Sequence, residues 1–433
     1  MDKQTTDHPT ADLQVDSTQR RPWWRLLGPG VITGASDDDP SGIATYSQVG
    51  AQFGFGLLWT MPFSYPLMAV TQEISARVGR VTGHGLAGNL RRHFAPGWLY
   101  LLSGLLLVAN TINLGADLGA MGAAMKLVIG GHGHLYTLLF GVGCVLAQVF
   151  VPYHAYVRVL KWLSASLLAY VAVVLAVRVP WGAVLRATVL PHLTLSGPYL
   201  QGLIAVLGTT ISPYLFFWQA SQEVEDLHAT PGEERLTRAP EQAPQQFRRI
   251  RVDTFAGMGF SNLVAFFIIL TAAVTLHAGG VTTIQTAAQA AEALRPLAGN
   301  FAFVLFSLGI IGTGLLAVPV LAGSAAYAVG EALRWPVGLE RRPLAARGFY
   351  GILTAATLVG VALNFSPVDP VRALYWSAIV NGVTAGPVMI ALMLMASRHE
   401  VMGQFTLPRV LRVVGWLATA LMLAASAAML LTL

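Results

Sequence analysis

Apolar stretches long enough to cross a lipid bilayer recur along almost the whole chain. A transmembrane helix needs about 20 mostly apolar residues to cross a hydrocarbon layer roughly 30 Å thick. Charged residues, glycine and proline separate the stretches, so we expect about eleven membrane-spanning helices. Their predicted ranges are 26–53, 55–78, 98–128, 134–153, 155–178, 198–227, 252–277, 299–331, 348–364, 370–396 and 410–432.

Two polar segments stand out from this pattern. Residues 1–22 have no apolar core, so we predict a short disordered cytoplasmic tail and not a cleaved signal peptide. Residues 228–250 contain three prolines, which indicates a cytoplasmic loop between the sixth and seventh spans. We predict that residues 23–433 form one transmembrane domain.

The composition indicates that lipid is the solvent for most of the chain. Hydrophobic residues make up 55% and charged residues 11% of the 433, which leaves too little polar surface for a soluble globule of this size. The formal charge of +6 is not accompanied by basic blocks interleaved with aromatic residues, so we expect no nucleic-acid partner. The single cysteine, Cys144, excludes an internal disulfide.

The basic residues are distributed unevenly between alternate loops. If the N-terminus is cytoplasmic, only five of the 27 Lys and Arg fall in outside segments: Lys126, Arg178, Arg186, Arg295 and Arg372. This asymmetry agrees with the positive-inside rule. We therefore expect a multi-pass protein in the lipid bilayer of a bacterial cell (inner) membrane, with its N-terminus in the cytoplasm.

Three consecutive carboxylates lie inside the first predicted span. Asp37, Asp38 and Asp39 precede Pro40 and Gly42, so the helix is expected to open here and expose backbone carbonyls. An ionisable side chain at mid-membrane is costly unless it faces water or a cation, and carboxylates beside carbonyls are ligands of hard cations. The alternative is that the cluster only caps a helix end in the headgroup region. Apolar residues on both sides argue against that alternative.

The sixth predicted span is interrupted in a similar way. Residues 208–214 read Gly-Thr-Thr-Ile-Ser-Pro-Tyr, and Pro213 breaks a long apolar stretch near its centre. Interrupted helices at the first and sixth positions are typical of an inverted repeat of five plus five helices. We expect repeats at about 23–178 and 198–396, an eleventh helix after them, and a substrate site between the breaks. For the sixth span alone, a simple proline kink is the alternative.

Three motifs carry a resemblance to a known family. They are Gly28-Pro29-Gly30, Asp39-Pro40-Ser41-Gly42 and the Thr-Thr-Ile-Ser-Pro-Tyr stretch, and they resemble motifs of the NRAMP family of divalent-metal transporters, which has the LeuT fold. The resemblance runs through at least the first eight spans and is most specific in the first. It implies an all-α polytopic membrane protein that carries metal ions by alternating access. It implies no cofactor, because the metal ion is the cargo.

The resemblance also assigns candidate metal ligands. In that family the first helix carries Asp-Pro-Gly-Asn and the sixth carries Ala-x-x-Met-Pro-His-Asn, and the Asp, Asn, Met and an alanine carbonyl hold the ion. Asp39 matches the family aspartate. The other three ligand positions hold Gly42, Thr209 and Ser212. Tyr214 replaces the family histidine, and Gln219 replaces a second histidine.

These replacements change the expected selectivity. A thioether favours softer transition metals, whereas carboxylate, hydroxyl, carbonyl and water oxygens favour Mg²⁺, Ca²⁺ and Mn²⁺. Gly42 and Ser212 also enlarge the site, which suits a Mg²⁺ ion that keeps some of its water. The pattern resembles the NRAMP-related magnesium transporter branch, whose members carry Mg²⁺ and Mn²⁺. Because Tyr214 and Gln219 do not exchange protons readily at neutral pH, we expect transport without proton coupling.

Other polar residues inside the spans are candidates for the ion path. Asp117 is an intramembrane acid that either lines the path or is a paired structural acid. Glu223 lies on the same helical face as Gln219, which favours a vestibule position. Asn110 and Asn113 are expected to form interhelical hydrogen bonds. The expected ion-path or vestibule residues are Asp37, Asp38, Asp117, Tyr214, Gln219, Glu223 and Asn381.

Three other functions stay open at this point: a transporter of an organic solute or amino acid with the same fold, a proton-coupled transition-metal importer, and a membrane-embedded enzyme. An amino-acid site would present a helix N-terminus to the substrate carboxylate, without an Asp cluster beside it. A membrane metalloprotease would carry a His-Glu-x-x-His motif, which the chain lacks. We therefore expect a transporter of divalent metal ions and not an enzyme.

Overall fold

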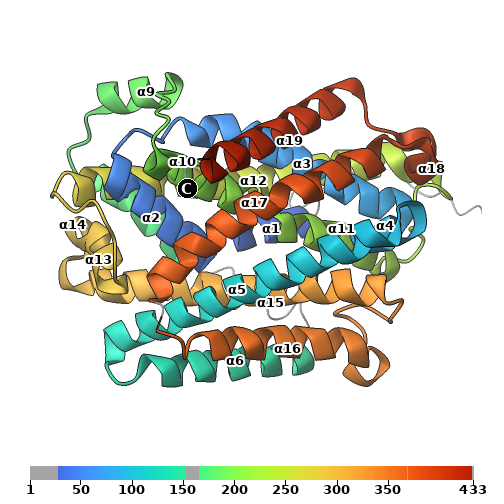
Figure 1. Cartoon of the computed structure of the whole chain (residues 1–433), viewed down its shortest axis with the longest axis horizontal. Coiled ribbons are helices and arrows are strands. Elements are labelled where there is room, and N and C mark those ends of the chain that lie inside the picture. The colour runs from blue at the N-terminus through green and yellow to red at the C-terminus, as the bar shows by residue number, and fades with distance from the viewer. Residues whose placement is uncertain (1–27, 152–164, 368, 432–433) are drawn as a thin grey trace, which may run out of the picture.

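The structure is a computed structural model that describes residues 28–151, 165–367 and 369–431. Every regular element in this part of the chain is helical (Figure 1). The predicted tail 1–22 lies outside the described residues. So do residues 152–164, which include the start of the predicted fifth span.

The long helices follow the predicted spans. They are α3 (Thr60–Thr82), α5 (Pro96–Ile129), α6 (Gly133–Phe150), α8 (Leu168–Ala176), α12 (Ala243–Ala272) with its π-helical end η4 (Ala273–His277), α15 (Ala302–Ala332), α16 (Arg347–Leu363), α17 (Pro370–Ser397) and α19 (Arg409–Leu430). The sequence did not predict the short helices α4 (Leu86–His93), α9 (Trp181–Val189), α13 (Ala287–Ala291), α14 (Arg295–Ala298) and α18 (His399–Met402). Single 3-10 turns are η2 (Ala165–Leu167), η3 (Pro240–Gln242), η5 (Glu292–Leu294), η6 (Gly299–Phe301), η7 (Pro343–Ala345) and η8 (Gly403–Phe405).

Seven helical segments of the described chain are long and apolar enough to cross a membrane. The first predicted span is not among them because it is divided into two short helices. The helix α3 is excluded by its charged second half, which holds Glu73, Arg77 and Arg80. The helix α16 is apolar but shorter than the others. The loop predicted at 228–250 is too long at its end, because α12 begins at Ala243 and the last residues of that range are helical.

Both predicted helix breaks are present. In the first span, α1 (Pro29–Asp37) ends and α2 (Pro40–Phe53) begins around an extended Asp39. In the sixth, α10 (Gly197–Thr210) and α11 (Pro213–Ala229) are joined through Ile211 and an extended Ser212. A residue before proline avoids the helical conformation, whereas proline fits well at the first position of a new helix. Each proline therefore ends one half-helix and begins the next.

The helices differ in how much of their surface contacts protein. In the most apolar stretch of α10 and α11, 83% of the residues are buried, against 22% in α6 and 33% in α19. Both α6 and α19 carry exposed leucines and valines, as expected of helices that face lipid. The second broken helix is therefore central, and α6 lies at the periphery beside α16 (Figure 1).

The turn between α3 and α4 is fixed to the end of α15. Glu331 accepts hydrogen bonds from the backbone N–H groups of Gly85 at 3.0 Å and Gly88 at 2.7 Å. These N–H groups lie at the start of α4, where a helix leaves its first donors without partners of its own. A carboxylate from α15 thus caps α4 and holds it against the transmembrane helices.

The half-helix α1 packs on α12 backbone to backbone. A Cβ atom added to Gly34 would lie 2.3 Å from the backbone carbon and oxygen of Gly257, and one added to Gly30 would lie 2.8 Å from the amide nitrogen of Thr254. Small residues at such a contact allow two membrane helices to approach closely. Asp253 reinforces it, since its carboxylate accepts from the N–H groups of Gly28, Gly30 and Val31 at 2.8, 2.6 and 3.1 Å.

We expect Gly34→Ala to destabilise the protein, because the added methyl group forces α1 and α12 apart. Overpacking of this kind costs about 1–3 kcal/mol. The matched control is Gly104→Ala in α5, where the new Cβ meets nothing within 4 Å. Thermal unfolding in detergent should show a lower midpoint for Gly34→Ala only. Equal midpoints for the two variants would contradict the close packing of α1 on α12.

Candidate functional site

Asp39 lies where the two helix breaks meet. Its Oδ1 accepts a hydrogen bond from the N–H of Gly42 at 2.7 Å and so caps α2. Its Oδ2 accepts from the side-chain amide of Asn113 on α5 at 3.2 Å and from the hydroxyl of Tyr214 on α11 at 3.4 Å. Asp39 is 1% exposed, so this carboxylate is enclosed by protein.

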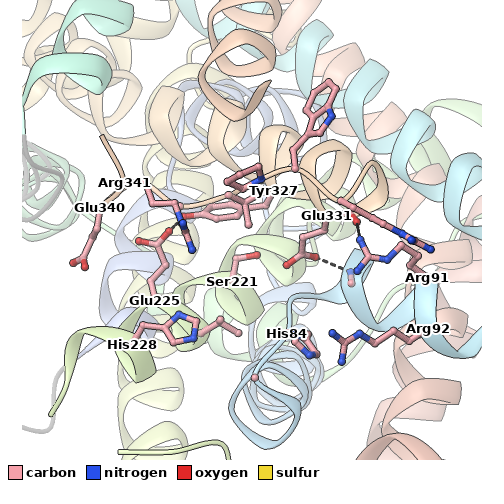
Figure 2. Close-up of a pocket in the computed structure, with 18 residues that line it drawn as sticks. His84, Arg91, Arg92, Ser221, Glu225, His228, Tyr327, Glu331, Glu340 and Arg341 are labelled. Carbon is pink, nitrogen blue, oxygen red and sulfur yellow. Dashed lines mark hydrogen bonds between the residues drawn. The ribbon is translucent and has the colours of Figure 1, made fainter. Parts of the chain in front are cut away.

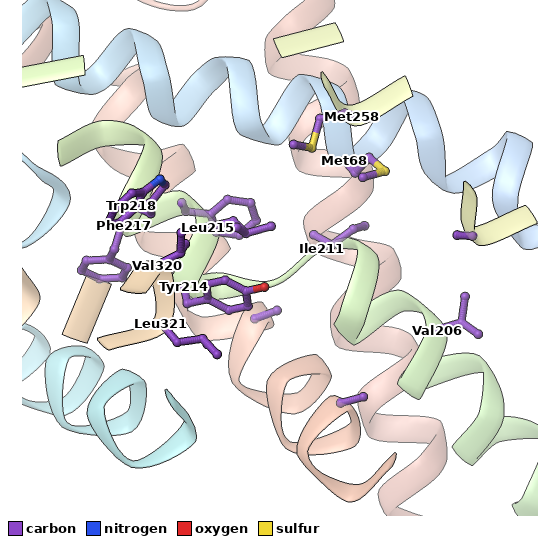
Figure 3. Packing of buried hydrophobic residues seen from close by; sticks show 14 of the residues in the cluster. Met68, Val206, Ile211, Tyr214, Leu215, Phe217, Trp218, Met258, Val320 and Leu321 are labelled. Atoms are coloured by element: carbon purple, nitrogen blue, oxygen red, sulfur yellow. The ribbon is translucent and has the colours of Figure 1, made fainter. Parts of the chain in front are cut away.

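The neighbours of Asp39 are held by further helices. The side-chain oxygen of Asn113 accepts from the hydroxyl of Ser377 on α17 at 2.6 Å. The Tyr214 hydroxyl also lies 3.4 Å from the backbone oxygen of Ser36, in the last turn of α1. Figure 3 shows Ile211 and Tyr214 on the two sides of the extended link between α10 and α11. Groups from α1, α2, α5, α11 and α17 therefore converge at this point.

The other two carboxylates of the cluster, Asp37 and Asp38, contact Ser261 of α12. The hydroxyl of Ser261 lies 2.6 Å from Oδ2 of Asp37 and 3.1 Å from Oδ1 of Asp38, and its single proton can serve only one of them. The remaining oxygens, Oδ1 of Asp37 and Oδ2 of Asp38, have no hydrogen-bond partner among the described residues. Both side chains are 1% exposed.

A fourth buried acid, Asp117, projects from α5. Its carboxylate lies near Asp39 and the backbone of Ser41, and neither of its oxygens has a side-chain hydrogen-bond partner among the described residues. No Lys, Arg or His of the described chain forms an ion pair with these four acids. The acids also do not form a compact carboxylate cage, since no group of three or more His, Cys, Asp or Glu in the described residues is arranged to hold a metal.

The sixth-helix candidates lie at the end of α10. The Ser212 Oγ lies 2.8 Å from the backbone oxygen of Gly208 and 2.9 Å from that of Thr209, and its single proton is shared between these acceptors, which leaves the hydroxyl lone pairs free to accept or to coordinate. Across from them, a Cβ added to Gly42 would lie 3.4 Å from both the backbone oxygen of Asp37 and the ring of Tyr46. Gly42 therefore leaves a small space where another residue would have a side chain, and oxygen atoms border this space. Thr209 and Ser212 are 3% and 2% exposed, so the site is closed to solvent in this structure.

Three other candidates lie farther from Asp39. The side-chain oxygen of Gln219 accepts from the hydroxyl of Thr33 and joins α11 to α1. Glu223 forms an ion pair with Arg249 of α12 and is fully buried, so it is not open to a vestibule in this structure. Asn381 is buried on α17 with its side-chain oxygen unpartnered, and no hydrogen bond connects it to Asp39.

Arg249 belongs to a cluster of charges that closes one end of the molecule. It lies 3.5 Å from Asp226, which in turn lies 3.3 Å from Arg80, and Arg80 also pairs with Glu233. The ion-pair cluster, defined as Arg80, Glu223, Asp226, Glu233 and Arg249, links α3, α11, α12 and the segment after α11.

A family model described as natural resistance-associated macrophage protein-like matches residues 30–432. The chain belongs to the Nramp family. Among its relatives, the divalent metal cation transporter MntH of Acidiphilium cryptum is 27% identical over 410 residues, which are 91% of this chain and 88% of that protein. MntH of Klebsiella pneumoniae strain 342 is 26% identical over 408 residues, which are 92% of this chain and 91% of that protein.

Solved structures give the same fold for this Nramp protein. A mutant of the Eremococcus coleocola manganese transporter superposes with a TM-score of 0.74 at 16% identity, over 97% of this chain and 90% of that one. Mhp1, a nucleobase-cation-symport-1 family transporter, superposes with a TM-score of 0.53 at 16% identity, over 94% of this chain and 91% of that one. The all-α LeuT-like fold that the resemblance implies is confirmed. The relatives are named as transporters, which supports the expectation that this chain is not an enzyme.

Sequence reasoning missed several residues that shape the site of this Nramp protein. Asn113 forms the expected interhelical hydrogen bond to Ser377 but also donates to Asp39, and its polar side chain in an apolar helix is its only signal. Asn110 behaves as expected, with its amide donating to the backbone oxygen of Leu321 and to Ser324 on α15. Ser261 is one serine among many, and only the fold places it beside the two acids.

Proposed function

We propose that this Nramp protein carries Mg²⁺ and Mn²⁺ across the membrane by alternating access, without proton coupling. The observation that carries the proposal is the buried Asp39 at the junction of the two helix breaks. The proposed ligands at this junction are the Asp39 carboxylate, the Ser212 hydroxyl and the Thr209 carbonyl, which offer oxygen atoms and no sulfur or imidazole. Oxygen ligands favour Mg²⁺ and Mn²⁺ over softer metals.

In the proposed site, Asp39 supplies the charged ligand and Thr209 supplies its backbone carbonyl. Ser212 supplies its hydroxyl through a lone pair, because its proton is engaged with the α10 backbone. The position of Gly42 is left to water. Mg²⁺ dehydrates reluctantly and commonly keeps several waters in protein sites. A divalent ion bound here would also offset the uncompensated charge of the neighbouring acids.

Transport requires that the closed site opens to each side in turn. We assign the ion-pair cluster to the cytoplasmic side, which agrees with a cytoplasmic N-terminus in a bacterial inner membrane. Asp37, Asp38 and Asp117 would then line the path, and Tyr214, Gln219 and Glu223 would become accessible when α11 separates from α1 and α12. The same proposal includes two repeats, at about 23–178 and 198–396. It also places Asn381 on the ion path.

The names of the relatives support a divalent metal ion as the substrate, but they do not support Mg²⁺ in particular. The two MntH proteins are named as divalent metal cation transporters, and the Eremococcus coleocola protein is named as a manganese transporter. The organic-solute alternative finds no support in these names. Selectivity for Mg²⁺ rests on the residue types at positions 42 and 212.

The first prediction separates the charge of Asp39 from its capping role. Asn caps a helix about as well as Asp, whereas Ala loses about 0.5–2 kcal/mol of capping energy. We therefore expect Asp39→Asn to fold normally but to lose Mn²⁺ binding in calorimetry and uptake in proteoliposomes. Asp39→Ala should lose both functions and some stability. The control is Asp369→Asn at the cap of α17, which should keep uptake. Normal uptake by Asp39→Asn would remove this carboxylate from the site.

The second prediction concerns selectivity. Ser212→Met introduces the thioether found in the family, so Cd²⁺ should gain affinity and Mg²⁺ should lose it, alone or together with Gly42→Asn. Competition of each metal against Mn²⁺ uptake measures the change. Ser366→Met, at an exposed position beyond α16, should leave the preference unaltered. If Ser212→Met also leaves it unaltered, the ligand assignment of the sixth helix is wrong.

The third prediction concerns the driving force. A membrane potential supplies about 2.3 kcal/mol per charge at 100 mV, or about 4.6 for a divalent ion, so coupling to protons is dispensable. Proteoliposomes loaded with a pH dye should take up Mn²⁺ under a K⁺ potential without internal acidification. The unpaired Asp117 is the residue that favours the proton-coupled alternative, because a buried carboxylate can relay a proton. Metal-dependent acidification that disappears in Asp117→Asn would establish that alternative.

A further inference from the structure

A cavity of about 600 Å³ lies at the same end of the molecule as the ion-pair cluster but does not include it. Its walls are the turn between α3 and α4, the end of α11, the end of α15 and the chain from Arg334 to Arg341 (Figure 2). None of the proposed metal ligands lines it. Its volume falls within the range of about 300–1,000 Å³ that is usual for small-molecule sites.

Four arginines line this cavity: Arg91, Arg92, Arg334 and Arg341. Arg91 donates to the backbone oxygen of Glu331. The side chains of Arg92, Arg334 and Arg341 form no ion pair with any described residue. Guanidinium groups at the wall of a cavity without carboxylate partners are donors available to a ligand.

The carboxylates of the cavity are already engaged. Glu331 caps α4 through the N–H groups of Gly85 and Gly88. Glu225 accepts from the Tyr327 hydroxyl and, at 2.8 Å, from the N–H of Leu339. Figure 2 shows Glu340 directed away from the other labelled side chains. The acids therefore fix the walls of the cavity, while the arginine side chains remain for an occupant.

The pKa values of neighbouring groups also indicate that the arginines make this wall of the cavity positive. Burial and then the charges of Arg92, Arg235 and Arg91 lower the pKa of His84 to about 4, so His84 is neutral at pH 7. Burial and the neighbouring Arg91 and Arg235 also lower the pKa of Arg92, and the nearby Glu331 carboxylate only partly opposes them. Positive charge at this wall repels a divalent cation, which argues against the cavity as an exit for the metal ion.

The backbone at one of the arginines is also unusual. Arg334 has a φ of +62°, and it is the only residue other than glycine with a positive φ in the described chain. This conformation ends α15 as a helix cap, because the N–H of Trp335 donates to the backbone oxygen of Gly330 at 2.8 Å and the N–H of Arg334 donates to that of Glu331 at 3.3 Å. The cap sets the direction in which Arg334 leaves the end of α15.

We infer that this cavity binds a phosphate group, with Arg92 and Arg334 as its principal ligands and Arg91 and Arg341 beside them. Arginine pairs with phosphate through parallel N–H···O bonds and stays charged, which suits this chemistry better than a metal ion or an uncharged solute. The phosphate belongs either to the headgroup of an anionic phospholipid or to a soluble phosphate compound. An occupant that touches both arginines links α4 to the segment after α15.

The test uses the full-length protein in nanodiscs and follows its thermal midpoint. Pyrophosphate is added in phosphatidylcholine nanodiscs at constant ionic strength, against a chloride reference, and phosphatidylglycerol nanodiscs form the second arm. The variant is Arg92→Gln/Arg334→Gln. Its control is Arg186→Gln/Arg372→Gln, which removes the same charge from exposed residues that do not line the cavity.

If the phosphate is soluble, pyrophosphate raises the midpoint of the wild type and the control by a few degrees but not that of the variant. If it belongs to lipid, pyrophosphate has no effect and phosphatidylglycerol stabilises the wild type and the control only. Either result supports the site and identifies the source. Equal responses of wild type and variant in both arms overturn it. If the double variant does not fold, Arg334→Gln alone, at an exposed position, takes its place with the same two outcomes.

Discussion

The structure depends on the burial of carboxylates that have no cationic partner. Asp37, Asp38, Asp39 and Asp117 lie in the interior of a chain whose solvent is lipid, and an ionised carboxylate in such surroundings is costly unless a cation or a proton offsets it. The helices are interrupted next to these acids. They bring N–H groups and carbonyls to the acids, and in the proposed function a metal ion supplies the charge that the protein lacks there.

The sequence was sufficient for the architecture because the signals were local. Pro40 and Pro213 each interrupt a long apolar run, and both begin a half-helix at the expected residue. Spans such as 98–128 were predicted to within a few residues because charges and glycine bound them. The start of α12 was not predicted correctly, because the polar residues after Ala243 look like a loop but extend the helix and pair with neighbouring segments.

The site was predictable only in part because its neighbours come from distant segments. Asp39 could be named from the break and the motif, but its contact with Asn113 depends on how α5 packs against α2 and α17. Glu223 shows the opposite case. Its helical face suggested an open vestibule, yet Arg249, which precedes the predicted seventh span, pairs with it and closes that end. Pairings between segments that touch only in the folded chain leave no trace in residue spacing.

The cap that Asp253 provides has a consequence for how the molecule moves. Its carboxylate takes the first free N–H groups of α1, and the glycines beyond it let the two backbones touch. Separation of α1 from α12 would therefore expose three amide donors and a carboxylate together, with no side chain to fill the gap. These contacts couple α1 to α12, and α1 ends at the short link formed by Asp38 and Asp39. We therefore expect a tilt of α1 to displace α12, and with it Ser261 and Arg249, so that the acids and the ion-pair cluster change together.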